Sequence, residues 1–255
     1  MNTIEISVIS NRAQITLPAS EILYIAMQGR KTVIHAAGNR SYESYTPVHT
    51  LAQTLGSRFI RVDRGCLVSA KAIHDVTKTV NLINGEELEY ARRRKREIIE
   101  QLQAERQKIV QALAHNDVPV SREDYQRHYA SFDYVPAAFT DIEIVFSEAH
   151  LAVDWIFRYG NQALAKLEKL PLEQLIGRAF GSIFPNMDAK WLRVYERAAL
   201  YGETLEITDY SPEIDTELKI VCFQTFPGHC GCILFDQQAI QTVQGSASEN
   251  SLPTP

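Results

Sequence analysis

The stretch Arg58-Phe59-Ile60-Arg61-Val62-Asp63-Arg64-Gly65-Cys66-Leu67-Val68-Ser69 decides the fold predicted for the first third of the chain. Apolar residues on both sides of Asp63-Arg64-Gly65 are typical of two short strands joined by a tight turn. An arginine in such a turn can bond phosphate oxygens or the edge of a guanine. A second basic segment, Arg92-Arg93-Arg94-Lys95-Arg96, follows a hairpin signal at Asn84-Gly85. These features predict a β-rich domain that binds DNA.

The surrounding sequence has the same strand character. Short alternating runs such as Ile4-Glu5-Ile6-Ser7-Val8 extend from about Thr3 to Val80, with a turn signal at Gly38-Asn39. Only Val48 to Leu55 has helical spacing in this half. We therefore expect an α+β protein whose residues 1–97 form a β-rich domain.

The segment from about Glu21 to Ile98 resembles the LytTR family of bacterial DNA-binding domains. The resemblance rests on Phe59 to Ser69, on an early strand at Ile22 to Ile25, on the Val48–Leu55 helix, on Ile73 and on Ala91-Arg92. The chain departs from the family at Asp63, Gly65 and Ser69, where the family usually has histidine, serine and asparagine. These departures bear on the preferred base sequence.

The resemblance implies that loops, and not a recognition helix, enter successive major grooves of the duplex. The residues expected to meet DNA are Arg30, Lys31, Thr32, Arg61, Arg64, Arg92, Arg93 and Arg94. Arginine suits bidentate bonds to guanine, whereas lysine and the trailing arginines suit phosphate. Arg61 lies inside a strand, so a structural salt bridge explains it equally well.

The distribution of charge supports two domains. Residues 1–100 carry 14 Lys/Arg against 10 Asp/Glu, and the remainder carries 12 against 21. A basic half suits a polyanion, and an acidic half does not. The sequence shows no signal peptide and no apolar run long enough to cross a membrane, so we expect a soluble, cytoplasmic protein. Four cysteines in 255 residues predict reduced thiols.

A helix is expected from about Arg93 to Leu113, because Ile98, Leu102, Glu105, Ile109 and Ala112 recur at heptad spacing. It can pair with a second copy to form a homodimer, or pack on its own domain. We assign residues 98–138 to this helix and a structured, aromatic-rich connector. Residues 241–255 form a polar tail that is expected to be disordered.

Residues 139–240 resemble a PAS domain in the order of their expected elements. These are two strands (141–146, 153–160), two short helices (161–168, 172–176), a longer helix (188–201) and three strands (205–210, 217–226, 229–236). Specific matches are Val153 to Asn161 and Leu175 to Arg178. The resemblance implies a sensory or dimerising domain.

Aromatic residues of this domain either line a pocket for a small molecule or fill an ordinary core. The set comprises Trp155, Phe157, Tyr159, Phe180, Phe184, Trp191, Tyr195 and Phe223. A flavin–cysteine adduct is disfavoured because 161–183 contains no cysteine, and haem is disfavoured because the helices contain no histidine ligand. The cofactor therefore stays unknown.

Cys222, Cys230 and Cys232 can approach one another across the last hairpin, with His229 beside them. A zinc or redox site is one interpretation. The favoured one is three small buried residues, because zinc sites usually use Cys-x-x-Cys loops.

We therefore expect a one-component bacterial transcriptional regulator that binds double-stranded DNA. A ligand or dimerisation at the PAS domain would modulate its activity. The alternative is a PAS-based protein–protein signalling module with weak or no specific DNA binding, for which Asp63 in the turn is the best support. No nucleophile–base pair, phosphate loop or paired metal motif indicates an enzyme.

Overall fold

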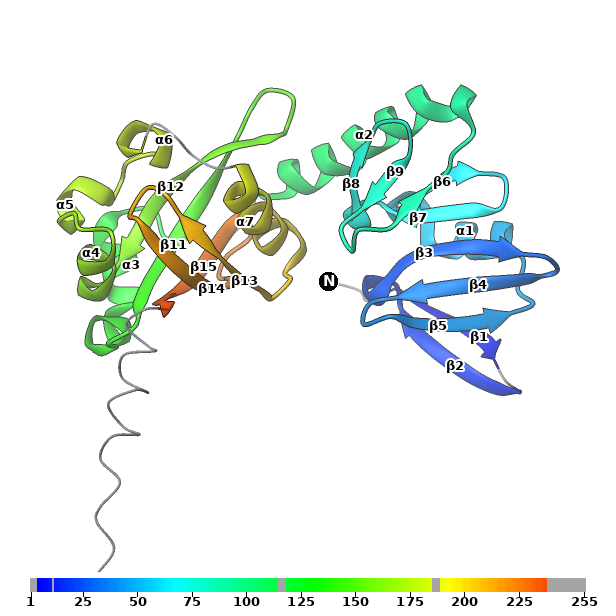
Figure 1. Ribbon diagram of the computed structural model, residues 1–255, viewed down its shortest axis with the longest axis horizontal. Helices are drawn as coiled ribbons and strands as arrows, with labels where there is room; N and C mark the ends of the chain where they lie inside the picture. The colour runs from blue at the N-terminus through cyan, green and yellow to red at the C-terminus, as the bar shows by residue number, and fades with distance from the viewer. Residues whose placement is uncertain (1–3, 11, 114–117, 185–188, 238–255) are drawn as a thin grey trace, which may run out of the picture. The chain divides into compact units, whose positions relative to one another are not determined.

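A computed structural model describes residues 4–10, 12–113, 118–184 and 189–237 (Figure 1). The chain divides into two compact units, Met1–Lys108 and Ile109–Pro255. The predicted polar tail, residues 241–255, lies outside the described residues. No helix in the described ranges is long and apolar enough to span a membrane.

The first unit is built mainly from short strands. Its strands are β1 (Glu5–Ser10), β2 (Ala13–Pro18), β3 (Ile22–Gln28), β4 (Lys31–Ala36), β5 (Arg40–Ser44), β6 (Phe59–Asp63), β7 (Cys66–Ser69), β8 (Ile73–Val76), β9 (Val80–Leu82) and β10 (Glu87–Leu88). Its helices are η1 (Ala19–Glu21), α1 (Val48–Leu55), η2 (Gly56–Arg58), η3 (Ala70–Ala72), η4 (Arg92–Arg94) and α2 (Lys95–Leu113). The central sheet has the order β5-β4-β3-β7-β6 and is flanked by the β1-β2 pair and the β10-β9-β8 sheet. The expected α1 helix and the Asn84-Gly85 hairpin are both confirmed.

Both faces of the central sheet are buried, because alternate residues of its strands enter different cores. Phe59 and Leu67 pack with the β1-β2 pair and α1. Ile60, Val62 and Val68 pack on the other side with β8, β9 and the start of α2. This two-sided burial accounts for the adjacent apolar residues in Phe59-Ile60 and Cys66-Leu67-Val68.

The first turns of α2 pack on the domain that precedes them. Ile98 is fully buried in the core of the first unit and Leu102 packs against the same core. The Glu105 carboxylate accepts a hydrogen bond from the Ser57 hydroxyl at 3.0 Å. The amino-terminal half of the heptad stripe is therefore used within its own domain.

The second unit is a five-stranded antiparallel sheet of order β12-β11-β15-β14-β13 with helices on both faces. Its strands are β11 (Ala138–Phe146), β12 (Ala152–Gly160), β13 (Leu205–Ser211), β14 (Thr216–Gln224) and β15 (His229–Asp236). Its helices are α3 (Arg122–His128), η5 (Ala130–Tyr134), α4 (Gln162–Leu167), α5 (Leu172–Leu175), α6 (Phe180–Ile183) and α7 (Ala189–Tyr201). The predicted element order is confirmed, with α6 as an additional short helix.

One face of this sheet carries the main core, and the other carries the segment that we had assigned to a connector. Tyr125 and Tyr129, in or next to α3, pack with Phe139 and Tyr159 of the sheet. The fully buried carboxylate of Asp141 accepts hydrogen bonds from Tyr129 Oη at 2.7 Å and Thr225 Oγ1 at 2.5 Å, and pairs with His229 Nδ1 at 2.7 Å. The aromatic-rich connector is therefore part of the second unit.

Candidate functional sites

Two hairpin tips lie side by side at one end of the central sheet of the first unit. Gln28 pairs with Lys31, which leaves Gly29 and Arg30 as the β3–β4 turn, and Gly29 supplies the positive φ of 64° that this turn needs. Asp63 pairs with Cys66, which leaves Arg64 and Gly65 as the β6–β7 turn. Because Met27 N donates to Gly65 O at 2.8 Å, the two turns are held together by the backbone.

The second basic segment lies next to the β6–β7 hairpin. Ala91 N donates to Val62 O at 3.3 Å, so η4 begins beside the last residues of β6. Figure 1 shows the start of α2 above β6, farther from the β3–β4 turn. The two hairpin tips and η4 therefore bring arginines from three segments to the same end of the sheet.

Four of the predicted contact residues are available to a ligand. The side chains of Arg30, Arg64, Arg92 and Arg93 are exposed and make no hydrogen bond or ion pair with any residue that the structure describes. Guanidinium groups of this kind carry five donors and a fixed positive charge. They form an unpaired basic cluster, which we call the arginine end.

The other predicted contact residues have partners within the protein. Lys31 Nζ pairs with Glu43 Oε2 at 2.5 Å, which raises the pKa of Lys31. Arg94 pairs with Glu97 at 2.7 Å. Thr32 is buried, and its hydroxyl donates to Thr46 O at 2.8 Å, so its side chain supports the fold beneath the tip.

Arg61 and Asp63 shape the β6–β7 turn. Arg61 donates to Asp63 O at 3.3 Å and to Arg64 O at 2.5 Å, so its guanidinium braces the turn through carbonyl oxygens and not through the salt bridge considered above. Asp63 Oδ1 accepts from Arg64 N at 2.7 Å. Both side chains therefore fix the backbone that presents Arg64.

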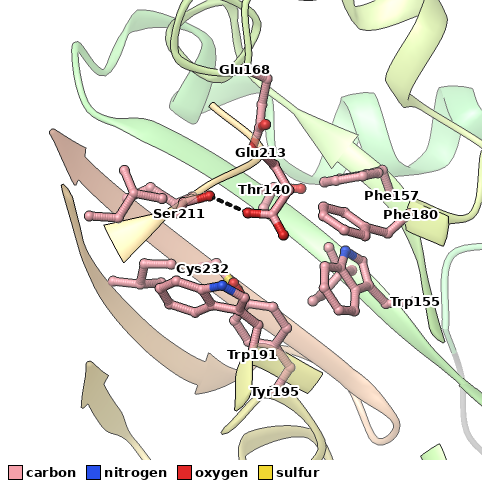
Figure 2. A pocket seen from close by; sticks show the side chains of 14 residues that line it. Thr140, Trp155, Phe157, Glu168, Phe180, Trp191, Tyr195, Ser211, Glu213 and Cys232 are labelled. Atoms are coloured by element: carbon pink, nitrogen blue, oxygen red, sulfur yellow. Dashed lines mark hydrogen bonds between the residues drawn. The ribbon is translucent and has the colours of Figure 1, made fainter. Parts of the chain in front are cut away.

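The second unit contains a small cavity on the face of its sheet that α4, α5, α6 and α7 cover. Its volume is about 40 Å³, which is room for a few water molecules. Figure 2 shows aromatic rings on one side of this space and the carboxyl groups of Glu168 and Glu213 pointing into it. Of the eight aromatic residues predicted for a pocket, five line it: Trp155, Phe157, Phe180, Trp191 and Tyr195.

The remaining three do not line the cavity. Phe184 packs against Phe180, with ring centroids 4.6 Å apart, and is not part of the cavity lining. Phe223 faces the opposite side of the sheet, because it alternates with the inward Cys222. Tyr159 also faces the opposite side, although two-residue spacing from Phe157 predicts the same side.

A β-bulge explains the position of Tyr159. Asp141 pairs with Tyr159 and the adjacent Ile142 pairs with Phe157, so β12 contains one residue more than β11 at this point. Such an insertion moves the following side chain to the other face. The Tyr159 hydroxyl instead donates to Asp133 Oδ1 at 2.6 Å, which ties η5 to the sheet.

The two cavity carboxyl groups were not predicted from the sequence. Burial, with a smaller contribution from Glu213, raises the pKa of Glu168 to about 7. Ser211 donates to Glu213 Oε2 at 2.7 Å, while Glu213 Oε1 is buried without a hydrogen-bond partner among the described residues. Glu168 follows α4 and Glu213 lies between β13 and β14, so no sequence motif joins them.

Comparison with protein families decides the nature of the first unit. Residues 12–103 match the LytTr DNA-binding domain family. They form a LytTR DNA-binding domain. The four arginines of the arginine end all lie within this LytTR domain.

Solved structures also include similar proteins. The LytTR DNA-binding domain of a response regulator from Bacillus cereus is 17% identical, with coverage of 40% of this chain and 98% of that chain and a TM-score of 0.36. The PAS domain of an HTR-like protein from Haloarcula marismortui is 13% identical, with coverage of 46% and 99% and a TM-score of 0.29. No curated protein matches the chain.

The LytTR domain also exposes two large side chains at its arginine end that the sequence analysis missed. Tyr45 follows Ser44, the partner of Thr32, and is 76% exposed. Met27 precedes the β3–β4 turn and is 54% exposed. A tyrosine directly after a strand, next to a basic turn, was the available signal. Apolar side chains at such a position can contact a thymine methyl group or a sugar.

Proposed function

We propose that this protein is a one-component bacterial transcription regulator that acts in the cytoplasm and binds promoter DNA through its LytTR domain. The arginine end carries the proposal, because four unpaired guanidinium groups come from three segments at one end of the central sheet. Such a cluster neutralises phosphates and can bond base edges.

Arg30 and Arg64 are proposed to contact bases. They occupy the tips of two hairpins, which are narrow enough to enter a major groove about 12 Å wide. Arg92 and Arg93 begin beside β6 and are proposed to contact the flanking DNA backbone. Arg92 is also proposed to contact a guanine. Arg61 and Thr32 act indirectly by holding the tips.

The PAS-like second unit is proposed to control DNA binding. α2 begins in the LytTR domain and ends beyond Ile109, the first residue of the second unit. A ligand in the cavity or a change in dimerisation would alter how two α2 helices associate, and hence the spacing of two LytTR domains. Ile109 and Ala112 are the positions of the heptad stripe assigned to this homodimer contact.

The alternative, a protein–protein signalling module with weak DNA binding, rested on the acidic Asp63. Its carboxylate accepts the Arg64 backbone N–H, which gives it a structural role in the turn. An acidic residue here is thus compatible with DNA binding, and the DNA-binding proposal is the one we favour.

Selection of binding sequences from a random duplex pool tests the proposal. The full-length protein should enrich a defined sequence, and its affinity for that sequence should fall steeply with salt concentration, as expected for several neutralised phosphates. A variant with Arg30, Arg64, Arg92 and Arg93 replaced by alanine should enrich none. Enrichment of no sequence by the wild-type protein, with weak binding to all DNA, would support the signalling-module alternative.

A further inference from the structure

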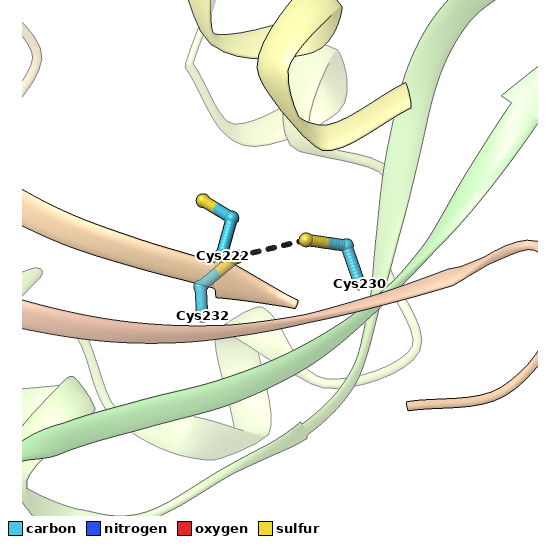
Figure 3. A group of neighbouring side chains, drawn as sticks. All are labelled: Cys222, Cys230 and Cys232. Carbon is cyan, nitrogen blue, oxygen red and sulfur yellow. Dashed lines mark hydrogen bonds between the residues drawn. The ribbon is translucent and has the colours of Figure 1, made fainter. Parts of the chain in front are cut away.

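Three cysteine side chains meet in the core of the second unit, on the face of its sheet that α4, α5, α6 and α7 cover. Cys222 of β14 lies directly opposite Cys232 of β15, and Cys230 points to the same side two residues earlier. All three sulfur atoms lie within 4.8 Å of one another, and Cys230 Sγ is 3.6 Å from Cys232 Sγ (Figure 3). All three residues are at most 1% exposed.

This arrangement has the dimensions of a three-sulfur metal site. A metal ion about 2.3 Å from each of three sulfurs in a plane holds them about 4 Å apart. The separation of 3.6 Å between Cys230 Sγ and Cys232 Sγ, and the limit of 4.8 Å for all three sulfurs, are compatible with that value. Simple core packing requires no such convergence, because any three small apolar side chains would fill the same volume.

The ligand set favours a soft ion over zinc. Structural zinc almost always has four ligands. Within the described ranges, no fourth histidine, cysteine, aspartate or glutamate atom joins the three sulfurs. His229 faces the other side of the sheet, where its Nδ1 pairs with Asp141. An all-sulfur site of three ligands suits Cu(I), which soft thiolates select.

The cavity reaches one of the three cysteines. Cys232 forms part of the cavity lining, together with the carboxyl groups of Glu168 and Glu213 (Figure 2). Oxygen ligands at this position suit harder ions, whereas the sulfurs suit a soft one. A small ion inside the cavity would therefore meet both kinds of ligand, and a soft ion would prefer the sulfurs.

We propose that Cys222, Cys230 and Cys232 form a binding site for one soft monovalent metal ion, with Cu(I) as its representative. The sulfur atoms supply all three ligands, and the ion links β14 to β15 in the core of the second unit. The site lies outside the LytTR domain, so ion binding and DNA binding are measurable separately.

Anaerobic titration of the full-length protein with Cu(I), against a chromogenic Cu(I) chelator, tests the site. The wild-type protein should retain one Cu(I) per chain and resist displacement by Zn(II). Cys222→Ala, Cys230→Ala and Cys232→Ala should each weaken binding by at least about a hundredfold, because even loss of an outer partner of a metal ligand costs about 10–100-fold. Cys66→Ala is the matched control. Cys66 lies in the LytTR domain, where burial raises the pKa of its thiol to about 12.

X-ray absorption of the wild-type complex makes the test independent of how well the variants fold. A shell of three sulfurs supports the proposal, and a shell containing nitrogen or oxygen ligands overturns it. The proposal also fails if the wild-type protein loses Cu(I) to the chelator, if the three alanine variants retain it, or if retention depends on Cys66.

Discussion

Replacement of Arg64 by alanine should remove sequence preference while leaving the fold intact. The Arg64 side chain is exposed and has no partner among the described residues, and the bonds that hold its turn use backbone atoms and the side chains of Arg61 and Asp63. The variant should therefore unfold at the wild-type urea concentration. Its only loss should be the proposed contact between the guanidinium and DNA.

The magnitude follows from the kind of contact. A bidentate arginine–guanine pair contributes about 1–3 kcal/mol of discrimination, which corresponds to about a 5- to 150-fold change in affinity for the selected sequence. Binding to random DNA should change far less. Arg96→Ala is a suitable comparison, because Arg96 is 91% exposed and pairs with Glu100 on the surface of α2. Its loss, if any, should be similar on selected and random DNA.

Fluorescence anisotropy with the selected duplex and a scrambled duplex, at two salt concentrations, measures both effects. Lys31→Ala adds a third case, in which affinity for both duplexes falls and the salt dependence becomes shallower. If Arg64→Ala weakens binding to both duplexes equally, Arg64 is a phosphate contact, and the assignment of the β6–β7 tip to base recognition is wrong.

Three further predictions concern the second unit, which contains both tryptophans, Trp155 and Trp191, so that their fluorescence reports its unfolding. Asp141→Asn removes the fully buried carboxylate that accepts hydrogen bonds from Tyr129 and Thr225 and contacts His229, and should cost about 1–3 kcal/mol of unfolding free energy in urea; an unchanged midpoint would contradict the importance of this network. Gly231→Ala places a Cβ 2.7 Å from Thr225 Cγ2 and should cost about 1–3 kcal/mol, and a neutral effect would show that the strand yields. The raised pKa of Glu168 means that the folded state keeps a proton that the unfolded state has released, so stability should fall as pH rises from about 4.5 to about 7. Glu168→Gln should abolish this fall and add on the order of 2 kcal/mol at pH 8, and an unaltered pH profile would exclude Glu168 as its source.

The sequence predicted elements well where a local signal specified them. The β6–β7 hairpin follows from alternating residues around Asp63-Arg64-Gly65, and the β14–β15 hairpin follows from a turn at Pro227-Gly228. The order of elements in the second unit was predictable for the same reason. Local sequence patterns determine strands and turns, and the structure has both hairpins where these patterns predict them.

Side-chain partners were not predictable, because they depend on strand register. Lys31 meets Glu43 across two strands, and no local pattern distinguishes it from the unpaired Arg30. The two-residue period of a strand gave the wrong face of the sheet for Tyr159, because the β12 bulge adds one residue and moves its side chain to the other face. The cavity carboxyl groups come together only through the tertiary fold. The sequence thus indicated which residues could contact DNA, but not which of them the fold leaves free.

The backbone bond between Met27 and Gly65 has a consequence for the spacing of contacts on DNA. It makes the β3–β4 and β6–β7 hairpins neighbours in one sheet, so their centres lie two strand spacings apart, about 10 Å. Three base-pair steps of about 3.4 Å cover the same length. Substitutions at the tips can alter which base is bonded, but the interval between the two contacts is a property of the sheet and should be shared by every operator that the protein uses.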